Sequence, residues 1–404
     1  MVLTDRIISG TSAYSKVGYE TCTRLSKMGH QIAHTPMAKA NRMGKQAFDN
    51  ILIYPSGDDY FAEDVAMPNY LDFHANMLIS IKEPWVFNHI FKLPLNFVPM
   101  VVVDHSPISP AIISRLPWAF KLIAISRHAQ KELRSQGMPS HYIPHGVRTD
   151  LYKPLDKTVE CRKLFYLDED VFTVGIVALN RARKLIPRML RGYRRFIDLN
   201  PDVKTQMMLW TNVMPRKHDD ITVGISDLGV NLLPEITNLK LHNYVHWPKW
   251  EDIQKIGGLP EWDSKGGWDM VRLYNTMDVL LLATGGEGFG LPYIEAQCCG
   301  VPAISTNYAA GPEQIGSGYT VKAKDYAIIN TPGTRFALPS IDHMAECLAK
   351  VCNGNREKQA KKARTFALRY DWNIIMDQYW TPFIKECEEE LYPLVKEGKI
   401  KTYA

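Results

Sequence analysis

The most informative segment of the sequence is Thr284-Gly-Gly-Glu-Gly-Phe-Gly-Leu-Pro-Tyr-Ile-Glu-Ala-Gln-Cys-Cys-Gly-Val-Pro302, which directly follows the apolar run 279–283. A short apolar run that ends at a glycine-rich turn predicts a buried strand. Pro292 then suits the start of a helix, where a missing N–H costs nothing. Strand, turn and helix in this order place the free N–H groups of a helix start at the carboxyl edge of a parallel sheet, where they can bind phosphate.

Two carboxylates accompany this turn, Glu287 within it and Glu295 about one helical turn inside the helix. Carboxylates are poor partners for phosphate, but they accept hydrogen bonds from vicinal hydroxyls. The pair therefore suits a ligand that carries both phosphate and sugar, such as a nucleotide sugar. In the alternative interpretation Glu295 only complements the helix start, and the glycines only turn the chain.

Elsewhere in the chain, short apolar runs alternate with amphipathic stretches in two successive blocks. The first block predicts strands at 6–9, 31–34, 51–54, 77–81, 100–103 and 122–125, with a helix at 19–28 that ends at Gly29. The second block predicts strands at 171–178, 206–210, 278–283 and 302–305, with helices at 185–197 and from Pro292 onward. Strands separated by helices indicate an α/β fold with parallel sheets covered on both faces.

Composition excludes several classes of protein. The chain has 404 residues, of which 46% are hydrophobic and 23% charged, so it is neither disordered nor a disulfide mini-scaffold. A formal net charge of +5 is too small to argue for a nucleic-acid partner. No apolar run approaches the roughly 20 residues of a membrane span. Seven cysteines without paired spacing indicate reduced thiols, and we expect a cytoplasmic protein.

The spacing Glu287-x7-Glu295 within Glu-Gly-Phe-Gly-Leu-Pro resembles the donor-site motif of retaining GT-B glycosyltransferases, in particular family 4. Further segments resemble the family in the same order, namely 9–18, 124–133, 143–147 with His145 where the family has Asn, and 370–372. The resemblance implies two Rossmann-like domains that face each other across a cleft. It places an acceptor-side first domain at 1–146 together with a crossover helix at about 376–404, a linker at 147–154, and the nucleotide-sugar-binding domain at 155–375.

The same resemblance implies transfer of a sugar from a nucleoside diphosphate to an acceptor hydroxyl, with retention at the anomeric carbon and no metal. Glu295 would hold the ribose, and Glu287 the donor sugar. The other implied donor-side positions are Gly18, Gly288, Phe289, Gly290, Leu291, Val245 and Trp247. UDP is the first choice of donor nucleotide and GDP the second, on family frequency. The acceptor could be a glycan, a lipid, a protein or a nucleic acid. A peripheral contact with a membrane is also compatible with the sequence.

The segment Asn180-Arg-Ala-Arg-Lys184 resembles the Arg/Lys pair that neutralises the diphosphate in this family. Asn180 occupies the place of the usual Arg, and Arg183 is the candidate to substitute for it beside Lys184. Departure of a nucleoside diphosphate builds negative charge on its β-phosphate, which fixed cations stabilise most in the transition state. The resemblance implies that this phosphate assists deprotonation of the acceptor hydroxyl on the same face.

His105 follows the strand 100–103 and therefore lies at a carboxyl edge. The resemblance places it near the donor sugar, where it would bind a hydroxyl or polarise the site. The alternative is a structural histidine held in a network with Asp104.

Three further signals each have a plain interpretation. Asp168-Glu169-Asp170 imitates a metal-binding Asp-x-Asp, but its polar context favours a solvated turn. The basic segment 181–195 predicts an amphipathic helix with Lys184, Arg188, Arg191 and Arg195 on its outer face, and the sharper interpretation is a surface for an anionic acceptor. Four tryptophans either line a base or acceptor wall or pin down a long loop, namely Trp247, Trp250, Trp262 and Trp268.

Other functions fit less well. The segment 9–14 lacks the G-x-G-x-x-G of a dinucleotide-binding oxidoreductase, and no G-x-S-x-G hydrolase motif occurs. A non-hydrolysing nucleotide-sugar epimerase of the same architecture remains an alternative. A catalytically silent GT-B scaffold or nucleic-acid-binding protein is the alternative from a different class.

Overall fold

The computed structural model describes residues 1–5, 7, 12–39, 41, 43–155, 161–214, 229–248, 270–328 and 333–396. The chain divides into two compact units. The first comprises Met1–Val103, Ile108–Gly146 and Trp372–Ala404, and the second comprises Asp104–Pro107 and Val147–Asp371. Within the described ranges, none of the helices combines the length and the apolar character that crossing a bilayer requires.

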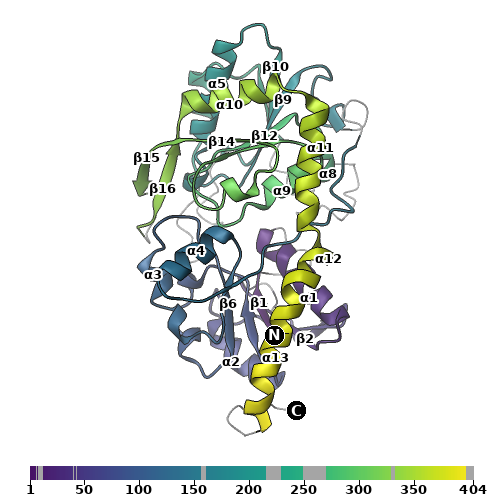
Figure 1. The fold of residues 1–404 in the computed structure, drawn as a ribbon, viewed down its shortest axis with the longest axis vertical. Coiled ribbons are helices and arrows are strands. Elements are labelled where there is room, and N and C mark those ends of the chain that lie inside the picture. The colour runs from purple at the N-terminus through teal and green to yellow at the C-terminus, as the bar shows by residue number, and fades with distance from the viewer. Residues whose placement is uncertain are drawn as a thin grey trace. The chain divides into compact units, whose positions relative to one another are not determined.

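The first unit is an eight-stranded sheet in the order β3-β4-β2-β1-β5-β6-β7-β8, with every neighbouring pair parallel except β3 and β4. Its strands are β1 Val2–Thr4, β2 Ile32–Pro36, β3 Gln46–Phe48, β4 Ile51–Ile53, β5 Leu78–Ser80, β6 Phe97–Val101, β7 Ile123–Ala124 and β8 His141–Tyr142. Its helices before the C-terminal segment are α1 Ala13–Lys27, α2 Glu63–Asp72, α3 Pro110–Ile113 and α4 Arg127–Ser135, with 3-10 turns η1 Pro84–Val86, η2 Ile90–Lys92 and η3 Leu116–Trp118. Figure 1 labels β1, β2 and β6 of this sheet.

The predicted strands from 31–34 to 122–125 are confirmed as β2, β4, β5, β6 and β7. The first strand of the structure is Val2–Thr4, and the strand predicted at 6–9 lies outside the described residues except for Ile7. Three buried residues suffice for β1 because β2 and β5 cover its two edges. Helix α1 begins after Ser12, whose hydroxyl accepts from the Ser15 N–H at 3.0 Å, and Gly29 past its end has φ +98° as a C′ residue requires.

The C-terminal segment returns to the first unit. It consists of α12 Trp372–Ile375, the π-helical turn η9 Met376–Trp380 and α13 Thr381–Lys396. Lys121 Nζ lies 2.9 Å from Glu386 Oε1 and 2.6 Å from Glu390 Oε2, and the Phe383 ring packs against His141 at 5.0 Å between centroids. The predicted crossover helix thus packs on the first unit, and its part at 397–404 lies outside the described residues.

The second unit contains a parallel six-stranded sheet in the order β11-β10-β9-β12-β13-β14 and a separate antiparallel hairpin, β15 with β16. Its strands are β9 Phe172–Val177, β10 Thr205–Trp210, β11 Val245–His246, β12 Val279–Leu282, β13 Ala303–Thr306, β14 Gly318–Val321, β15 Ala323–Ile328 and β16 Arg335–Pro339. Its helices include η5 Ala182–Lys184, α5 Ile186–Leu199, α6 Leu233–Asn238, α8 Met270–Asn275, α9 Leu291–Cys298, α10 Ile341–Cys352 and α11 Arg356–Ala367. All four strands predicted for this unit are confirmed.

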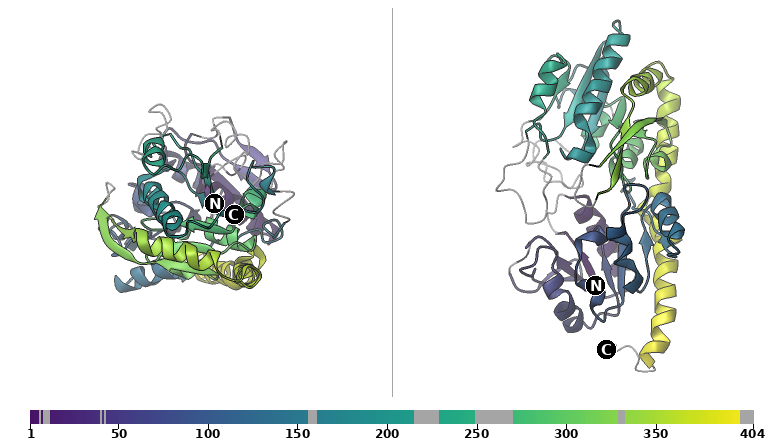
Figure 2. Two further views of the ribbon diagram at one scale, coloured as in Figure 1. Left: turned by 90° about the horizontal axis from the view of Figure 1, so that it is seen from above. Right: turned by 90° about the vertical axis from the view of Figure 1, so that its left-hand side faces the viewer.

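Helices cover both faces of this sheet, as the predicted parallel arrangement requires (Figure 2). Helix α5 packs on α10, and α9 packs on α8 and α11. Residues 147–154 group with this unit, since Arg364 donates from Nη2 to the Thr149 carbonyl at 2.9 Å and also binds the Tyr152 carbonyl.

A buried ion pair joins the starts of β9 and β12. Arg162 Nη2 lies 2.7 Å from Asp278 Oδ2, and the side chains are 4% and 2% exposed. The same carboxylate oxygen accepts from the Thr173 N–H at 2.8 Å, and Arg162 Nε donates to the Thr276 carbonyl at 3.1 Å. A buried charge is tolerated only when paired and hydrogen-bonded in this way.

We expect Arg162→Ala to lower the free energy of unfolding by about 3 kcal/mol, because it removes the buried partner of Asp278 and leaves this carboxylate paired with Arg356, whose side chain is 66% exposed. The measurement is urea denaturation followed by circular dichroism. The matched control is Arg195→Ala, since Arg195 pairs with Asp342 at 3.1 Å where both side chains are about half exposed. Such a surface pair is worth roughly 0–1 kcal/mol. Equal losses in the two variants would contradict a structural role for the buried pair.

Candidate donor-binding site

The loop between β12 and α9 is held by hydrogen bonds and close packing. Thr306 Oγ1 donates to the Thr284 carbonyl at 2.5 Å, and the Gly285 N–H donates to the Arg183 carbonyl at 2.8 Å. A Cβ at Gly286 would lie 1.9 Å from the Asp104 carbonyl oxygen, so only glycine fits there. Gly290 has φ +89° and caps the start of α9, whose first turn contains Pro292 as predicted.

Helix α9 carries Glu295 into the protein interior beside α8. The Tyr274 hydroxyl donates to Glu295 Oε2 at 2.7 Å, and both side chains are buried. Burial and the neighbouring carboxylate of Glu295 raise the pKa of Tyr274 well above its ordinary value, so its hydroxyl keeps its proton and orients the carboxylate. Tyr274 is not among the predicted site residues, because nothing in its local pattern shows that α8 packs on α9.

The predicted cations meet the predicted carboxylate at the base of this loop. Lys184 Nζ lies 2.5 Å from Glu287 Oε1, and Arg183 Nη1 lies 3.5 Å from Glu287 Oε2. Arg183 Nη1 also donates to the Gly286 carbonyl at 3.0 Å, which ties the cation to the loop itself. The side chains of Lys184 and Glu287 are only 13% and 7% exposed.

Burial and charge act on these groups in opposite directions. Burial works to raise the pKa of Glu287, but the charges of Lys184 and Arg183 outweigh it and hold this pKa below its ordinary value. Burial, together with the charge of Arg183, lowers the pKa of Lys184 to about 8 against the opposing effect of Glu287. The site therefore holds an ionised carboxylate and a lysine that loses its charge in mildly alkaline solution.

Asp104 extends the same network, and it was not among the predicted residues. Its Oδ1 lies 2.9 Å from His105 Nδ1, and its Oδ2 lies 3.8 Å from Arg183 Nε. Burial works to raise the pKa of Asp104, but the hydrogen bond from His105 and the charge of Arg183 outweigh it and hold that pKa below the ordinary value. His105 is thus held in the network with Asp104 that its alternative interpretation described, and a contact to the donor sugar stays a prediction.

The remaining predicted donor-side positions occupy different settings. Asn180 is buried, and its Nδ2 donates to the carbonyls of Asn212 and Val230 at 2.9 and 2.6 Å, so it fastens two loop segments together. Val245 is buried in β11, and Trp247 just past this strand is 36% exposed. Direct donor contacts of these residues stay predictions.

Gly18 lies in the first unit, in the middle of α1. A Cβ there would stand 2.6 Å from Thr4 Cγ2, so packing of α1 on β1 by itself explains a glycine. Gly288, Phe289 and Leu291 are buried in the loop and at the start of α9, and their contacts to a donor stay predictions. Trp250, Trp262 and Trp268 lie outside the described residues.

The basic segment is confirmed as an amphipathic helix, with one correction. The apolar residues Ile186, Leu190, Tyr193 and Ile197 are buried on α5, while Arg191 pairs with Glu235 at 2.5 Å and Arg194 is bound to Asp198. Lys184 does not share the outer face of this helix. It belongs to η5, because Leu185 with φ +52° separates that turn from α5.

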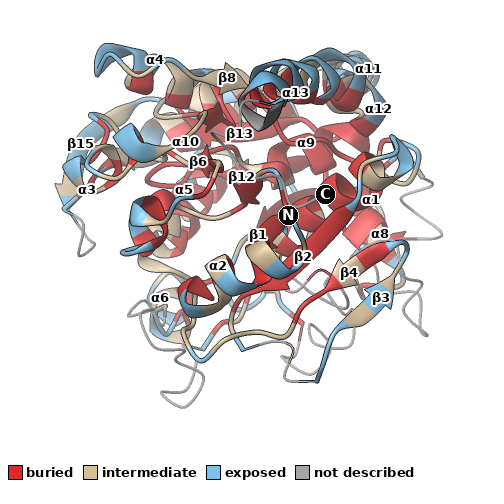
Figure 3. Cartoon of the chain, turned by 90° about the horizontal axis from the view of Figure 1, so that it is seen from below, coloured by how far each residue is buried: buried red, intermediate tan, exposed pale blue. Residues whose placement is uncertain are grey.

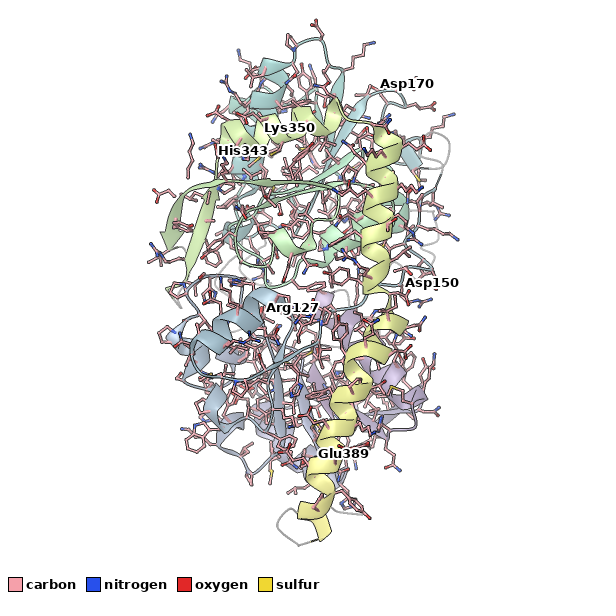
Figure 4. All side chains as sticks on the ribbon, viewed as in Figure 1. Arg127, Asp150, Asp170, His343, Lys350 and Glu389 are labelled. Atoms are coloured by element: carbon pink, nitrogen blue, oxygen red, sulfur yellow. The ribbon has the colours of Figure 1, made fainter. Side chains whose placement is uncertain are left out.

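The predicted turn at 168–170 is confirmed, and Asp170 lies exposed at the margin of the second unit (Figure 4).

Residues 264–366 match the family model described as glycosyl transferases group 1, and this range contains the whole loop with Glu287 and Glu295. Residues 264–366 are called the group 1 segment below, after the family model that they match. A D-inositol 3-phosphate glycosyltransferase of Saccharomonospora viridis is similar to the chain, with 30% identity over 118 residues. These residues are 28% of this chain and 25% of that protein, so the chain spans about a quarter of the length of this relative.

Solved structures of other proteins have a fold similar to that of this chain. Sucrose-phosphate synthase from Thermosynechococcus elongatus aligns with a TM-score of 0.66 and 14% identity, covering 94% of this chain and 92% of its own. Alr3699/HepE of Anabaena, in complex with UDP-glucose, aligns with a TM-score of 0.65 and 15% identity, covering 95% and 98%. These neighbours are GT-B glycosyltransferases, and the predicted fold class with two Rossmann-like units is confirmed.

Proposed function

We propose that the chain transfers a sugar from a nucleoside diphosphate to an acceptor hydroxyl, with retention at the anomeric carbon and without a metal. The observation that carries this proposal is the meeting of Lys184, Arg183 and Glu287 at the start of α9, with Glu295 buried farther along the same helix. Cations for a diphosphate and carboxylates for hydroxyls lie in one glycine-built site, and the group 1 segment contains both carboxylates.

Each group has a defined task in this reaction. Lys184 and Arg183 bind the diphosphate, and their charge stabilises the departing β-phosphate more strongly than the intact donor. The start of α9 contributes backbone N–H groups and its dipole at the same place. Glu287 accepts from hydroxyls of the transferred sugar, and Glu295, oriented by Tyr274, accepts from the ribose. The leaving phosphate takes the proton of the acceptor hydroxyl on the same face.

The proposed donor is a UDP-sugar, with a GDP-sugar as the second choice. The Anabaena neighbour with UDP-glucose in its structure supports this order, as an analogy of fold. The seven cysteines are free thiols, which supports a reducing, cytoplasmic setting as part of the proposal.

Calorimetric titration with UDP, GDP, ADP and their glucose and mannose conjugates tests the donor. We expect one nucleotide to bind with its sugar conjugate, and binding to persist in excess EDTA because Lys184 and Arg183 supply the positive charge. Absence of binding by every compound would overturn the proposal, and loss of binding in EDTA would overturn its metal-free part.

A non-hydrolysing nucleotide-sugar epimerase is the second candidate function, because it needs the same nucleotide-sugar site. Mass analysis of the products separates the two, because isomerisation leaves the mass of the nucleotide sugar unchanged whereas transfer releases the nucleotide. A silent nucleic-acid-binding scaffold predicts salt-sensitive DNA binding without nucleotide affinity. The pairing of Arg191 and Arg194 with carboxylates leaves less free charge on α5 for such a role.

Donor affinity is expected to fall as pH rises through about 8. Lys184 has its pKa lowered to about 8, so below that pH its ammonium is charged and binds the diphosphate, and above it the charge is lost. The dissociation constant of the preferred nucleotide sugar should rise by up to about tenfold per pH unit between pH 8 and 9. Lys184→Arg is the control, since arginine stays charged and should flatten the profile. A flat profile for the unaltered protein would contradict this role.

A further inference from the structure

Residues 104–107 group with the second unit, although the stretches of chain before and after them belong to the first. They contact the loop between β12 and α9, which is called the donor loop below. A Cβ at Gly286 in this loop would come within 1.9 Å of the Asp104 carbonyl oxygen, and Asp104 Oδ2 lies 3.8 Å from Arg183 Nε. Four residues bury little apolar surface of their own, so their position depends on specific anchors.

The Tyr308 hydroxyl supplies such an anchor. It accepts from the Ser106 N–H at 2.7 Å, and it shares its one proton between the Ser106 carbonyl at 3.0 Å and the Arg335 carbonyl at 2.8 Å. Burial raises the pKa of Tyr308 to about 12, so the hydroxyl keeps that proton in neutral and mildly alkaline solution. One side chain therefore binds both backbone groups of the residue that directly follows His105.

Tyr308 is itself held by the core of the second unit. It follows β13 by two residues, and both β13 and the neighbouring strand β12 are buried along their length (Figure 3). The Ala310 N–H donates to the Glu287 carbonyl at 3.1 Å, which joins this part of the chain to the donor loop. On the other side, the Tyr326 ring of β15 packs against the Tyr308 ring at 5.5 Å between centroids. The hydroxyl is therefore presented to Ser106 from a fixed frame.

Asp104 acts on both cations of the candidate site. It lies beside Arg183, as described above, and its charge also reaches Lys184. The charged groups that face Lys184 are Arg183 from η5, Glu287 from the donor loop and Asp104. Burial and the charge of Arg183 lower the pKa of Lys184, whereas Glu287 and Asp104 raise it. Displacement of Asp104 from this position would therefore leave Lys184 charged only at lower pH.

We propose that Tyr308 is a positioning residue of the donor site, which fixes the Ser106 backbone and thereby holds the Asp104 carboxylate beside Arg183 and Lys184. The proposal rests on the proposed function, because that function assigns the two cations to the diphosphate of the donor. Tyr308 acts through Asp104 and not by contact with the nucleotide sugar. Its hydroxyl thus extends the pH range over which both cations are charged.

Tyr308→Phe tests this role, because it removes the hydroxyl and keeps the ring. Calorimetry with the nucleotide sugar that binds best in the titration above gives the dissociation constant at pH 6.5 and at pH 8. The ratio of the value at pH 8 to the value at pH 6.5 should be about threefold larger in Tyr308→Phe than in the unaltered protein. Hydrogen exchange should become faster at residues 104–107 and stay unchanged in α9, which shows that the variant keeps its fold.

Asp104→Asn tests the route by which Tyr308 acts. It should raise the same ratio, and the double variant with Tyr308→Phe should not exceed Asp104→Asn alone, because both changes act through one carboxylate. Tyr326→Phe is the matched control, since it removes a hydroxyl from the ring packed against Tyr308 and its side chain is 46% exposed. It should leave the ratio unchanged.

The outcomes separate this role from the proposed function. An unchanged ratio in Tyr308→Phe or in Asp104→Asn would overturn the positioning role alone, and so would fully additive effects in the double variant. An equal change in Tyr326→Phe would also overturn it, because the effect would then come from the packing of the two rings. Failure of the unaltered protein to bind any nucleotide sugar would instead overturn the proposed function.

Discussion

Lys184→Ala is expected to lower turnover about 10²- to 10³-fold, while the dissociation constant of the donor nucleotide rises by only about tenfold. The ammonium group is nearly enclosed, at 2.5 Å from Glu287 in the free site, where the protein rather than water screens its charge. Such a charge stabilises the departing diphosphate more than the intact donor, so its loss is felt mainly in the chemical step. Steady-state kinetics with the preferred donor and calorimetry of nucleotide binding measure the two quantities separately.

The ion pair between Lys184 and Glu287 allows a stricter test of this prediction. Glu287→Gln removes the charge of the carboxylate but keeps its shape, and the double variant with Lys184→Ala measures how far the two act together. We expect the combined loss of turnover to be smaller than the product of the single losses, since each single change leaves a nearly buried charge with a weakened partner. Full turnover in Lys184→Ala with an unchanged melting temperature would remove Lys184 from the site.

The strand, glycine-rich turn and helix start on the donor side could be predicted from the sequence, because the residues that define them are close together in the chain. Pro292 and the glycines from 285 to 290 define a turn and a helix start by their own backbone preferences, and the apolar runs around them are long enough to identify parallel strands. Glu287, Lys184 and Arg183 were also anticipated, and the structure brings their charged groups together.

Residues that reach the site by tertiary packing carried no such signal. Tyr274 contacts Glu295 from α8, and Asp104 reaches Arg183 from a different part of the chain. The hairpin β15–β16 was not predicted, because β15 lacks the clean alternation of buried and exposed residues that marks a strand. Lys184 was placed on the face of α5, because a left-handed residue such as Leu185 gives no warning in sequence when it is not glycine.

Glu295→Ala is expected to raise the dissociation constant of the donor nucleotide about 10- to 100-fold, the value of hydrogen bonds to a charged acceptor. Turnover at saturating donor should change much less, because the ribose lies away from the bond that breaks. Comparing the nucleotide with its 2′-deoxy and 3′-deoxy forms tests the contact itself. The unaltered protein should prefer the full ribose over at least one of them by about tenfold, and Glu295→Ala should lose that preference.

Tyr274→Phe tests how far the proposed contact between Glu295 and the ribose depends on the hydrogen bond from Tyr274. It removes the 2.7 Å hydrogen bond to Glu295 but keeps the ring and the carboxylate, so we expect a loss of affinity of only about threefold, with ribose discrimination retained. If Glu295→Ala still discriminates between ribose and deoxyribose as strongly as the unaltered protein, Glu295 has only a structural role in the packing of α8 on α9. The alternative interpretation, in which Glu295 only complements the helix start, is less favoured by its position, because it lies in the second turn of α9, buried against Tyr274.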